Sequence, residues 1–278
     1  MTRVADALRE ATAKLAATSD TARLDAELLM AHALGMTRSD MLVRAMLEPS
    51  PEAFDALIER RSRREPVAYI IGHQEFYGRH FAVCPGILIP RGDSETIIEA
   101  AIEKWSDASR VLDLGTGSGA LLITALIELR DASGIGVDAS REAVEIAERN
   151  AQTNRLIGSR ARFMQRDWRN DGWTDDLGAF DLILCNPPYV EDDAELDPDV
   201  RDYEPASALF AGPDGLDDYR ILIPQLGKLL APGGIALFEI GAAQAPAVTE
   251  IAQNHGFVVE MRRDLAKRPR VLILTRPN

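Results

Sequence analysis

VLDLGTGSG, residues 111–119, ends one apolar run and leads directly into another at 120–129. The first run predicts a buried strand and the second predicts an apolar helix. Glycines at a strand-to-helix turn let the backbone approach a ligand closely, and the helix N-terminus presents unpaired N–H groups. The motif lacks the GK[ST] of a phosphate-binding loop, and its G-x-G-x-G spacing disfavours a dinucleotide. It therefore predicts a cofactor loop, with NAD, FAD and S-adenosylmethionine as the possible ligands and a glycine turn without a ligand as the alternative.

Strand candidates recur through the rest of the chain, and helical segments such as 140–152 and 217–230 separate most of them. The candidates are 111–114, 135–137, 162–165, 182–185, 235–240, 258–261 and 271–274. Strands separated by helices pair in parallel through right-handed crossovers, which predicts a doubly wound α/β sheet of seven strands. About nine residues separate the last two candidates. Because that is too short for a helical crossover, we predict an antiparallel edge pair.

The start of the chain predicts helices and carries no catalytic pattern. Leu24, Leu28 and Leu29 recur at helical spacing, and Pro51 suits the first turn of another helix. Apolar and aromatic residues at 75–89 surround two glycines, which predicts a short hairpin or an extended connector. The predicted organisation is a small helical domain at 1–72, a hairpin connector at 73–89 and the sheet domain at 90–278.

The composition is that of a globular protein. The chain has 278 residues, of which 46% are hydrophobic and 27% charged, and these values exclude collagen-like, coiled-coil and disordered classes. The two cysteines, Cys84 and Cys185, form no CxxC pair, which fits a reducing compartment. The first residues are charged and alanine-rich without an apolar core, and no window approaches 18 apolar residues. We therefore predict a soluble, cytoplasmic protein without a membrane span.

The charge distribution disfavours nonspecific binding to nucleic acid. The net charge is −13, whereas lysine and arginine supply most of the affinity for a phosphate backbone. The arginines at 60–64 and the basic residues at 262–270 are interpreted as solvated surface, with a local nucleic-acid patch as the alternative. The acidic run 191–199 is interpreted as a solvated loop. No metal is predicted, because no ligand spacing links the histidines, which are His32, His73, His80 and His255.

Polar residues follow the second and third strands of the predicted sheet. Asp138 lies 23 residues after Gly115, where a strand-end carboxylate accepts both ribose hydroxyls of a nucleoside. The alternative is that Asp138 only supplies negative charge near the start of the next helix. Asp167 follows the third strand and can accept from an adenine amino group, while Trp168 can pack on the ring. Both residues also have structural interpretations.

The fourth strand ends in Asn186-Pro187-Pro188-Tyr189. Downstream of the glycine loop, this motif resembles that of methyltransferases that alkylate planar NH2 groups. Further motifs are LDAELL at 24–29, PVAYIIG at 66–72, EFY at 75–77 and LIPR at 88–91. With these, essentially the whole chain resembles the protein-(glutamine-N5) methyltransferases that act on class I peptide chain release factors. The resemblance implies a class I methyltransferase-like sheet, S-adenosylmethionine as cofactor and the glutamine of a Gly-Gly-Gln loop as acceptor.

The resemblance also implies roles for individual residues. The Asn186 oxygen and the Pro187 carbonyl would accept from the substrate amide, and Tyr189 would form an aromatic wall. The implied cofactor-binding residues are Asp113, Gly115, Thr116, Gly117, Ser118, Gly119, Asp138, Asp167, Trp168 and Asn186. The implied substrate-binding residues are Asn186, Pro187, Pro188, Tyr189, Arg91 and Glu204. For Glu204 a solvated loop is the alternative. The helical domain is expected to dock the release factor, and the enzyme is expected to be a monomer.

The motif after Arg91 departs from the family pattern. This chain has Gly92-Asp93-Ser94-Glu95 where the family usually shows proline, an acidic residue, threonine and glutamate. A glycine loosens a turn that proline would stiffen, whereas Ser94 keeps the hydroxyl.

Two other functions remain as alternatives on the sequence alone. An N6-adenine or exocyclic-guanine methyltransferase of nucleic acid would use the same motif on a flipped base. A regulatory module that binds the cofactor without catalysis is the third.

Overall fold

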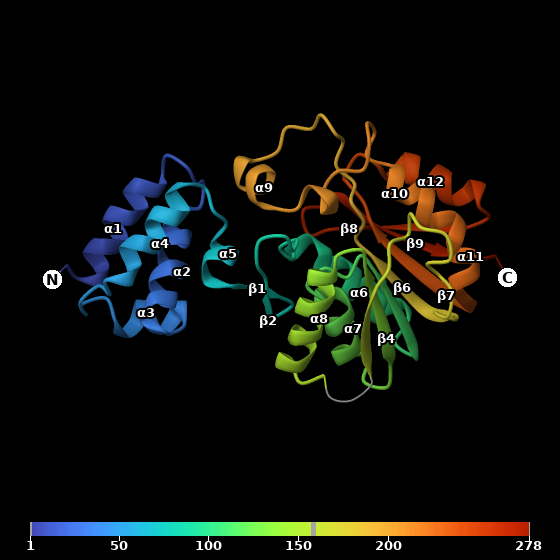
Figure 1. Ribbon diagram of the computed structural model, residues 1–278, viewed down its shortest axis with the longest axis horizontal. Helices are drawn as coiled ribbons and strands as arrows, with labels where there is room; N and C mark the ends of the chain where they lie inside the picture. The colour runs from blue at the N-terminus through green and yellow to red at the C-terminus, as the bar shows by residue number, and fades with distance from the viewer. Residues whose placement is uncertain (1, 157–159, 278) are drawn as a thin grey trace. The chain divides into compact units, whose positions relative to one another are not determined.

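The computed structural model describes residues 2–156 and 160–277. Contacts within the chain divide it into two units (Figure 1). We call Met1–His73 with Leu196–Tyr203 the helical unit, and Gln74–Glu195 with Glu204–Asn278 the sheet unit. The sequence prediction placed residues 196–203 in the domain 90–278, whereas they pack with the helical unit. The chain thus enters the helical unit twice.

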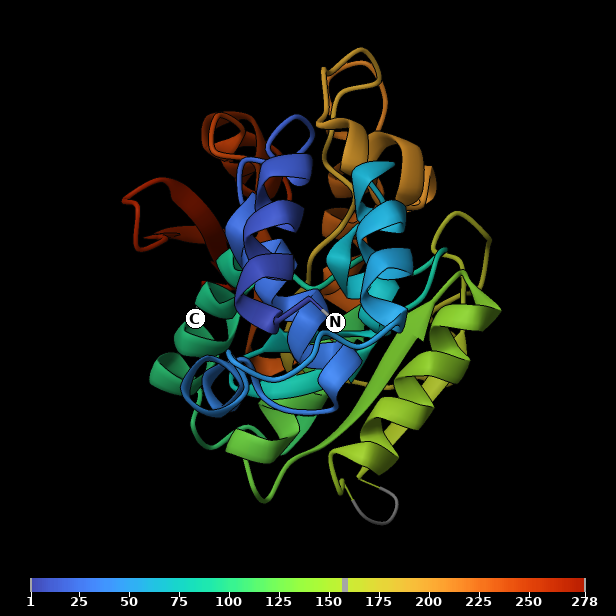
Figure 2. The same ribbon diagram turned by 90° about the vertical axis from the view of Figure 1, so that its left-hand side faces the viewer.

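The helical unit is built from α1 (Val4–Leu15), α2 (Ala22–Leu34), α3 (Arg38–Arg44), α4 (Ala53–Ser62), α5 (Val67–Ile71) and the short α9 (Pro198–Tyr203). Helices α1, α2 and α4 contact one another, and Figure 2 shows α1 and α4 side by side. Leu8, Leu29, Met30 and Phe54 are buried at their centre. The predicted helices are present, but Leu24 is 42% exposed and faces away from that core. Asp25 takes a buried place on α2 instead.

An arginine from the basic run 60–64 is buried in the helical unit. Arg61 donates from Nε to Asp25 Oδ2 and from Nη1 to Asp199 Oδ2 of α9, at 2.6 Å in both cases. Tyr203 at the end of α9 donates to the Arg63 carbonyl at 2.7 Å. The interpretation of the basic run as solvated surface is therefore wrong at Arg61, whose side chain is buried between Asp25 and Asp199, and Asp199 of the acidic run is partly buried by the same ion pair.

The sheet unit contains the seven-stranded sheet that the sequence predicted. Its strands are β3 (Arg110–Leu114), β4 (Ser133–Asp138), β5 (Ala161–Gln165), β6 (Phe180–Cys185), β7 (Leu230–Glu239), β8 (Val258–Arg263) and β9 (Pro269–Thr275). Their order is β5-β4-β3-β6-β7-β9-β8, with β9 antiparallel to both neighbours and the other pairs parallel. The chain reverses direction across the sheet between β3 and β6, so their carboxyl ends form a topological switch point. The predicted hairpin is also present, as β1 (His73–Phe76) and β2 (Arg79–Ala82).

Helices cover both faces of the sheet (Figure 1). Leu182 and Leu184 of β6 pack on the side of α6 (Glu95–Lys104), α7 (Ala120–Glu128) and α8 (Arg141–Thr153). Ile183 and Cys185 pack on the side of α10 (Asp217–Leu222), α11 (Leu226–Leu229) and α12 (Ala245–Asn254). The predicted helix at 217–230 is interrupted by Pro224, which lies in the 3-10 turn Ile223–Gln225 because proline removes a helical hydrogen bond.

The structure requires a glycine at position 119 but not at position 92. Gly119 has a φ of +81°, and a Cβ there would lie 2.8 Å from Ile123 Cδ1 and 3.1 Å from Ala147 Cβ of α8. The missing side chain of Gly119 therefore allows the first turn of α7 to pack closely on α8. Gly92 opens the 3-10 turn Gly92–Ser94 without a positive φ, and a Cβ at this position would have no atom within 4 Å. The departure at Gly92 thus leaves the turn intact.

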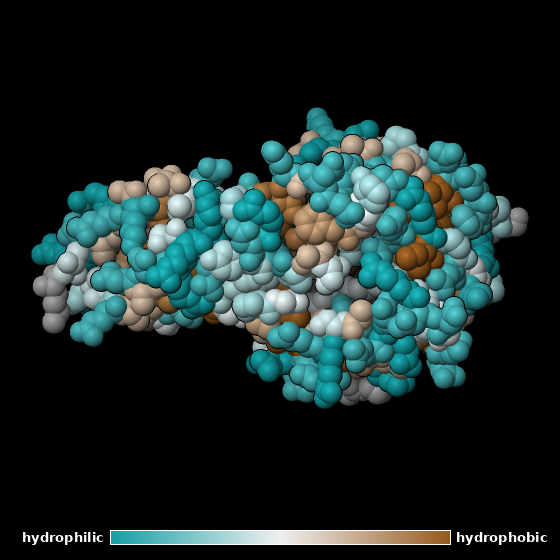
Figure 3. Space-filling view, turned by 45° about the horizontal axis from the view of Figure 1, so that its top comes forward, coloured by the Kyte–Doolittle hydropathy of each residue, from teal (hydrophilic) through white to brown (hydrophobic). Residues whose placement is uncertain are grey.

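Hydrophilic side chains dominate the face of the molecule drawn in Figure 3, and apolar atoms form a few separate groups on it. Within the described ranges, no helix combines the length and the apolar character needed to cross a membrane.

Candidate active site

A cavity lies at the carboxyl ends of β3, β4 and β6, where the strand order reverses, and it is lined entirely by the sheet unit. The space inside it, counted together with the open solvent at its mouth, is about 1050 Å³. The predicted residues that line it are Arg91, Gly115, Thr116, Gly117, Ser118, Asp138, Asp167, Trp168, Asn186 and Pro188. The predicted residues outside its lining are Asp113, Gly119, Pro187, Tyr189 and Glu204.

The glycine loop is held against the ends of β3 and β4. Thr116 donates from its hydroxyl to Asp113 Oδ2 at 2.6 Å, and the Gly117 N–H donates to Asp138 Oδ2 at 2.9 Å. Asp113 is fully buried, and burial raises its pKa to about 7. Asp113 therefore holds the loop through Thr116, and Gly115–Ser118 line the cavity.

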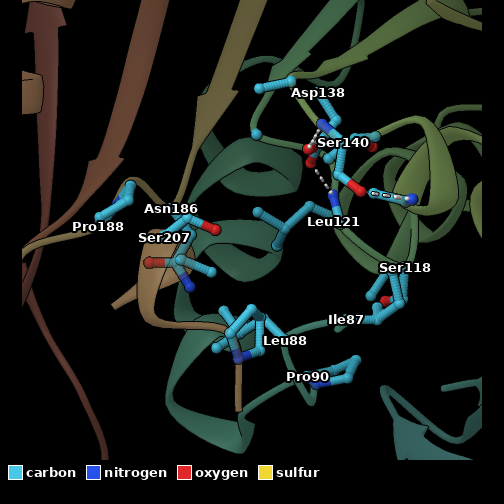
Figure 4. A pocket seen from close by; sticks show the side chains of 18 of the residues that line it. Ile87, Leu88, Pro90, Ser118, Leu121, Asp138, Ser140, Asn186, Pro188 and Ser207 are labelled. Carbon is cyan, nitrogen blue, oxygen red and sulfur yellow. Dashed lines mark hydrogen bonds between the residues drawn. The ribbon is translucent and has the colours of Figure 1, made fainter. Parts of the chain in front are cut away.

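Asp138 lies at the start of α8, as one of its two interpretations from the sequence has it, and its ribose role stays a prediction. Its Oδ1 accepts from the Ser140 N–H at 2.9 Å, and the Ser140 hydroxyl accepts from the Ala143 N–H at the start of α8. Figure 4 shows Asp138 and Ser140 on one side of the cavity, away from Asn186 and Pro188. Each carboxylate oxygen has further lone pairs, so these contacts leave acceptor capacity toward a ligand. Burial raises the Asp138 pKa above its usual 3.8.

Trp168 is fixed as a wall of the cavity. Its Nε1 donates to Asp218 Oδ1 at 2.7 Å, and its ring lies close enough to Gly115 to contact a Cβ there at 3.2 Å. Asp218 is fully buried on α10, and burial raises its pKa. Asp167 beside it accepts the Arg169 N–H at 2.9 Å through Oδ1. The indole is thus oriented by a carboxylate that sequence reasoning did not identify.

Asn186 is connected to a buried carboxylate. Its Nδ2 donates to Ser94 Oγ at 3.2 Å, and Ser94 Oγ donates to Glu239 Oε2 at 2.5 Å. Tyr189 donates from its hydroxyl to Glu239 Oε1 at 3.2 Å. Burial raises the Glu239 pKa, while the Ser94 hydrogen bond and the Arg270 guanidinium act in the opposite direction. Tyr189 and Ser94 thus donate to the same carboxylate, that of Glu239. The role of Tyr189 as an aromatic wall stays a prediction.

Glu204 forms a buried ion pair. Its Oε1 pairs with Arg91 Nη2, and its Oε2 accepts from the Ile89 N–H at 3.2 Å. Its side chain is only 1% exposed, so the alternative of a solvated loop is wrong. Pro205, which follows, does line the cavity. The ion pair therefore fixes the segment that forms this wall.

The chain is similar to known proteins along most of its length. A model of the PrmC N-terminal domain matches residues 6–72, and a model of a methyltransferase domain matches 106–262. The release factor glutamine methyltransferase of Geobacter sulfurreducens is 40% identical over 245 residues, covering 86% of this chain and 84% of the relative. That of Cereibacter sphaeroides is 40% identical over 277 residues and 97% of each chain. The chain belongs to the release factor glutamine methyltransferase family.

The fold of this release factor glutamine methyltransferase family member is also found in a solved structure. A methyltransferase from Pyrococcus furiosus superposes with a TM-score of 0.52 at 18% identity, covering 79% of this chain and 96% of that one. The family resemblance and the class I methyltransferase-like sheet predicted from the sequence are thus confirmed.

Several residues in and around the cavity of this family member were not predicted from the sequence. Ser207 lines it, and Ser94 and Glu239 support Asn186. The apolar lining includes Ile87, Leu88, Pro90 and Leu121 (Figure 4). Glu239 did leave a signal, because a carboxylate at the end of the apolar run 235–240 is unusual in a buried strand. Among the described residues, no group of three or more His, Cys, Asp or Glu side chains is arranged to hold a metal ion.

Proposed function

We propose that this family member transfers a methyl group from S-adenosylmethionine to the side-chain amide nitrogen of the glutamine in the Gly-Gly-Gln loop of a class I release factor. The observation that carries the proposal is the Asn186 amide at the cavity, with Nδ2 donating to Ser94. This leaves the Asn186 oxygen to accept from a substrate N–H. Membership in the family, whose named relatives are release factor glutamine methyltransferases, supports this acceptor.

The cavity has the chemistry that this cofactor requires. Asp138 offers acceptors for the ribose hydroxyls, Trp168 offers a face for the adenine, and Gly117 of the glycine loop donates its N–H to Asp138. The pKa values of Asp113 and Asp138 are raised because burial removes their carboxylates from water. A cation nearby would favour their ionised forms, and S-adenosylmethionine supplies an electrophilic methyl group on a positively charged sulfonium.

The residues at the end of β6 would make the substrate amide nitrogen more reactive. An amide nitrogen is a poor nucleophile because its lone pair is delocalised into the carbonyl. The Asn186 oxygen and the Pro187 carbonyl would accept from the two substrate N–H groups and orient the nitrogen lone pair. Their contribution is orientation and preorganised electrostatics, without a covalent enzyme intermediate. The proton of the product amide leaves to water.

The helical unit would dock the protein substrate, because a single glutamine side chain offers too little surface for selectivity. Its exposed apolar residues include Val43 of α3 and Leu47, which are 81% and 74% exposed. These side chains give the unit apolar surface outside its buried core.

Peptide mass spectrometry tests the proposal. A purified, unmethylated release factor is incubated with the full chain and S-adenosylmethionine, and the expected result is one methyl group on the glutamine of the Gly-Gly-Gln loop. A reaction without enzyme is the control. No added methyl, with cofactor binding confirmed by calorimetry, would contradict the acceptor, and methylation of DNA or RNA in a parallel reaction would redirect it to a nucleic-acid base.

The cofactor assignment predicts a loss of affinity in Asp138→Asn. The variant keeps an oxygen but loses the charge that strengthens hydrogen bonds to the ribose, so the Kd for S-adenosylmethionine should rise about 10- to 100-fold by calorimetry. Asp181→Asn is the matched control, because Asp181 Oδ2 also accepts two backbone N–H groups, from Ser109 and Arg110, but lies outside the cavity lining. An unchanged Kd in Asp138→Asn would rule out the ribose role.

A further inference from the structure

We propose that Ser94 and Glu239 are positioning residues that hold the Asn186 amide with its oxygen toward the cavity. The inference deepens the proposed function and rests on it, because it concerns the orientation of the group that accepts from the substrate amide. Neither Ser94 nor Glu239 is required to touch the reacting atoms.

The direction of the hydrogen bonds determines which end of the amide faces the cavity. A serine hydroxyl has one hydrogen, and Ser94 donates it to Glu239 Oε2 at 2.5 Å. Toward Asn186 the hydroxyl oxygen therefore can only accept, and Nδ2 is the end of the amide that donates to it, at 3.2 Å. If the amide were rotated by 180°, its oxygen would face a hydroxyl lone pair and its NH2 group would face the NH2 group of the substrate. Both contacts would be repulsive.

Glu239, the last acceptor in this chain of hydrogen bonds, is held in place by its surroundings. Glu239 lies at the end of β7, beside the strand that precedes Asn186, and is 1% exposed. Its two carboxylate oxygens accept from different hydroxyls, those of Ser94 and Tyr189. Its backbone carbonyl accepts from the hydroxyl of the fully buried Tyr219 at 2.7 Å. One carboxylate thus connects to both ends of the Asn186–Tyr189 motif.

The variants Ser94→Ala and Ser94→Thr separate this role from packing alone. In Ser94→Ala the Asn186 amide loses its directional partner, and kcat for release-factor methylation should fall between about 10-fold and 100-fold. The Kd for S-adenosylmethionine and the KM for the release factor should stay within about threefold, because Ser94 lines the cavity but is assigned no contact with either one. Ser94→Thr keeps the hydroxyl and should retain kcat within about threefold.

Ser109→Ala is the matched control for the loss of a hydroxyl that donates to a carboxylate. Ser109 Oγ donates to Asp181 Oδ2 at 2.7 Å and lies outside the cavity lining, so kcat should stay within about threefold of the parent value. Equal kcat in Ser94→Ala and the parent, or an equal loss of kcat in Ser109→Ala and Ser94→Ala, would overturn the inference.

Hydrogen exchange provides a readout that does not depend on activity. The Asn186 side-chain amide signal of the full chain, assigned by its absence in Asn186→Ala, should exchange faster in Ser94→Ala and at the parent rate in Ser94→Thr. Equal exchange in all three proteins would overturn the inference even if the parent enzyme methylates its substrate. A parent enzyme with no activity on the release factor would contradict the proposed function alone, and this exchange experiment would still decide the role of Ser94.

Discussion

Replacing Asn186 by alanine is expected to lower kcat for glutamine methylation by about 10²- to 10³-fold. The substitution removes the acceptor that orients the substrate nitrogen, and at this position no other side chain would replace it. The Kd for S-adenosylmethionine should change less than about threefold, since the proposed ribose and adenine contacts belong to Asp138 and Trp168. Single-turnover methylation followed by mass spectrometry, with calorimetry for the cofactor, measures both quantities.

The control for Asn186→Ala is Asn154→Ala. Asn154 is an amide at the end of α8 that donates to the His80 and Asn150 carbonyls and lies outside the cavity lining. Its replacement should lower stability modestly and leave kcat at the parent value. Methyl transfer at the parent rate in Asn186→Ala would exclude Asn186 from catalysis. A large loss of cofactor affinity in that variant would instead indicate that Asn186 acts mainly by holding the cofactor.

The parts of the site that follow strands could be predicted from the sequence. Apolar runs of strand length, separated by helical segments, give the order of the elements, and the carboxyl ends of parallel strands meet at one edge of a sheet. Gly115, Asp138, Trp168 and Asn186 are therefore expected near one another from the sequence alone. The structure places all four along one cavity.

The partners of those residues could not be predicted, because they come from distant parts of the chain. Ser94 and Glu239 are 145 residues apart in sequence, and Trp168 and Asp218 are 50 apart. No local pattern marks such pairs. A carboxylate or hydroxyl becomes a support only when the sheet order brings the ends of neighbouring strands together. Tertiary contacts of this kind determine the orientation of a site whose position the sequence already predicts.

Charged runs failed as predictors for the same reason. Arginines and aspartates in clusters are usually solvated, so burial of one member depends on a partner that the local sequence does not show. Arg61 has 7% of its side chain exposed, whereas Arg63, two residues later, has 71% exposed. The difference arises because the side chain of Arg61 points toward Asp25 and Asp199.

Arg61→Ala is therefore expected to destabilise the helical unit by about 3 kcal/mol. Removing one partner of a buried ion pair leaves an uncompensated charge and typically costs about 3–5 kcal/mol. The lower figure applies here because Asp25 also accepts from the hydroxyls of Ser19 and Thr21, at 2.7 and 2.8 Å. Asp199 keeps only a longer contact with Arg64, at 3.4 Å, so α9 should loosen most.

Native-state hydrogen exchange on the full chain measures this effect locally. Amides of α2, α4 and α9 should show a lower free energy of opening in Arg61→Ala, whereas those of β3 and β6 should keep the parent value, because the two groups belong to different units. Arg63→Ala on the same segment is the control and should stay within about 0.5 kcal/mol of the parent, since its side chain is exposed. Equal opening free energies in Arg61→Ala and Arg63→Ala would show that the buried ion pairs with Asp25 and Asp199 contribute no more than surface contacts do. Loss of protection throughout the sheet would show that the two units unfold together.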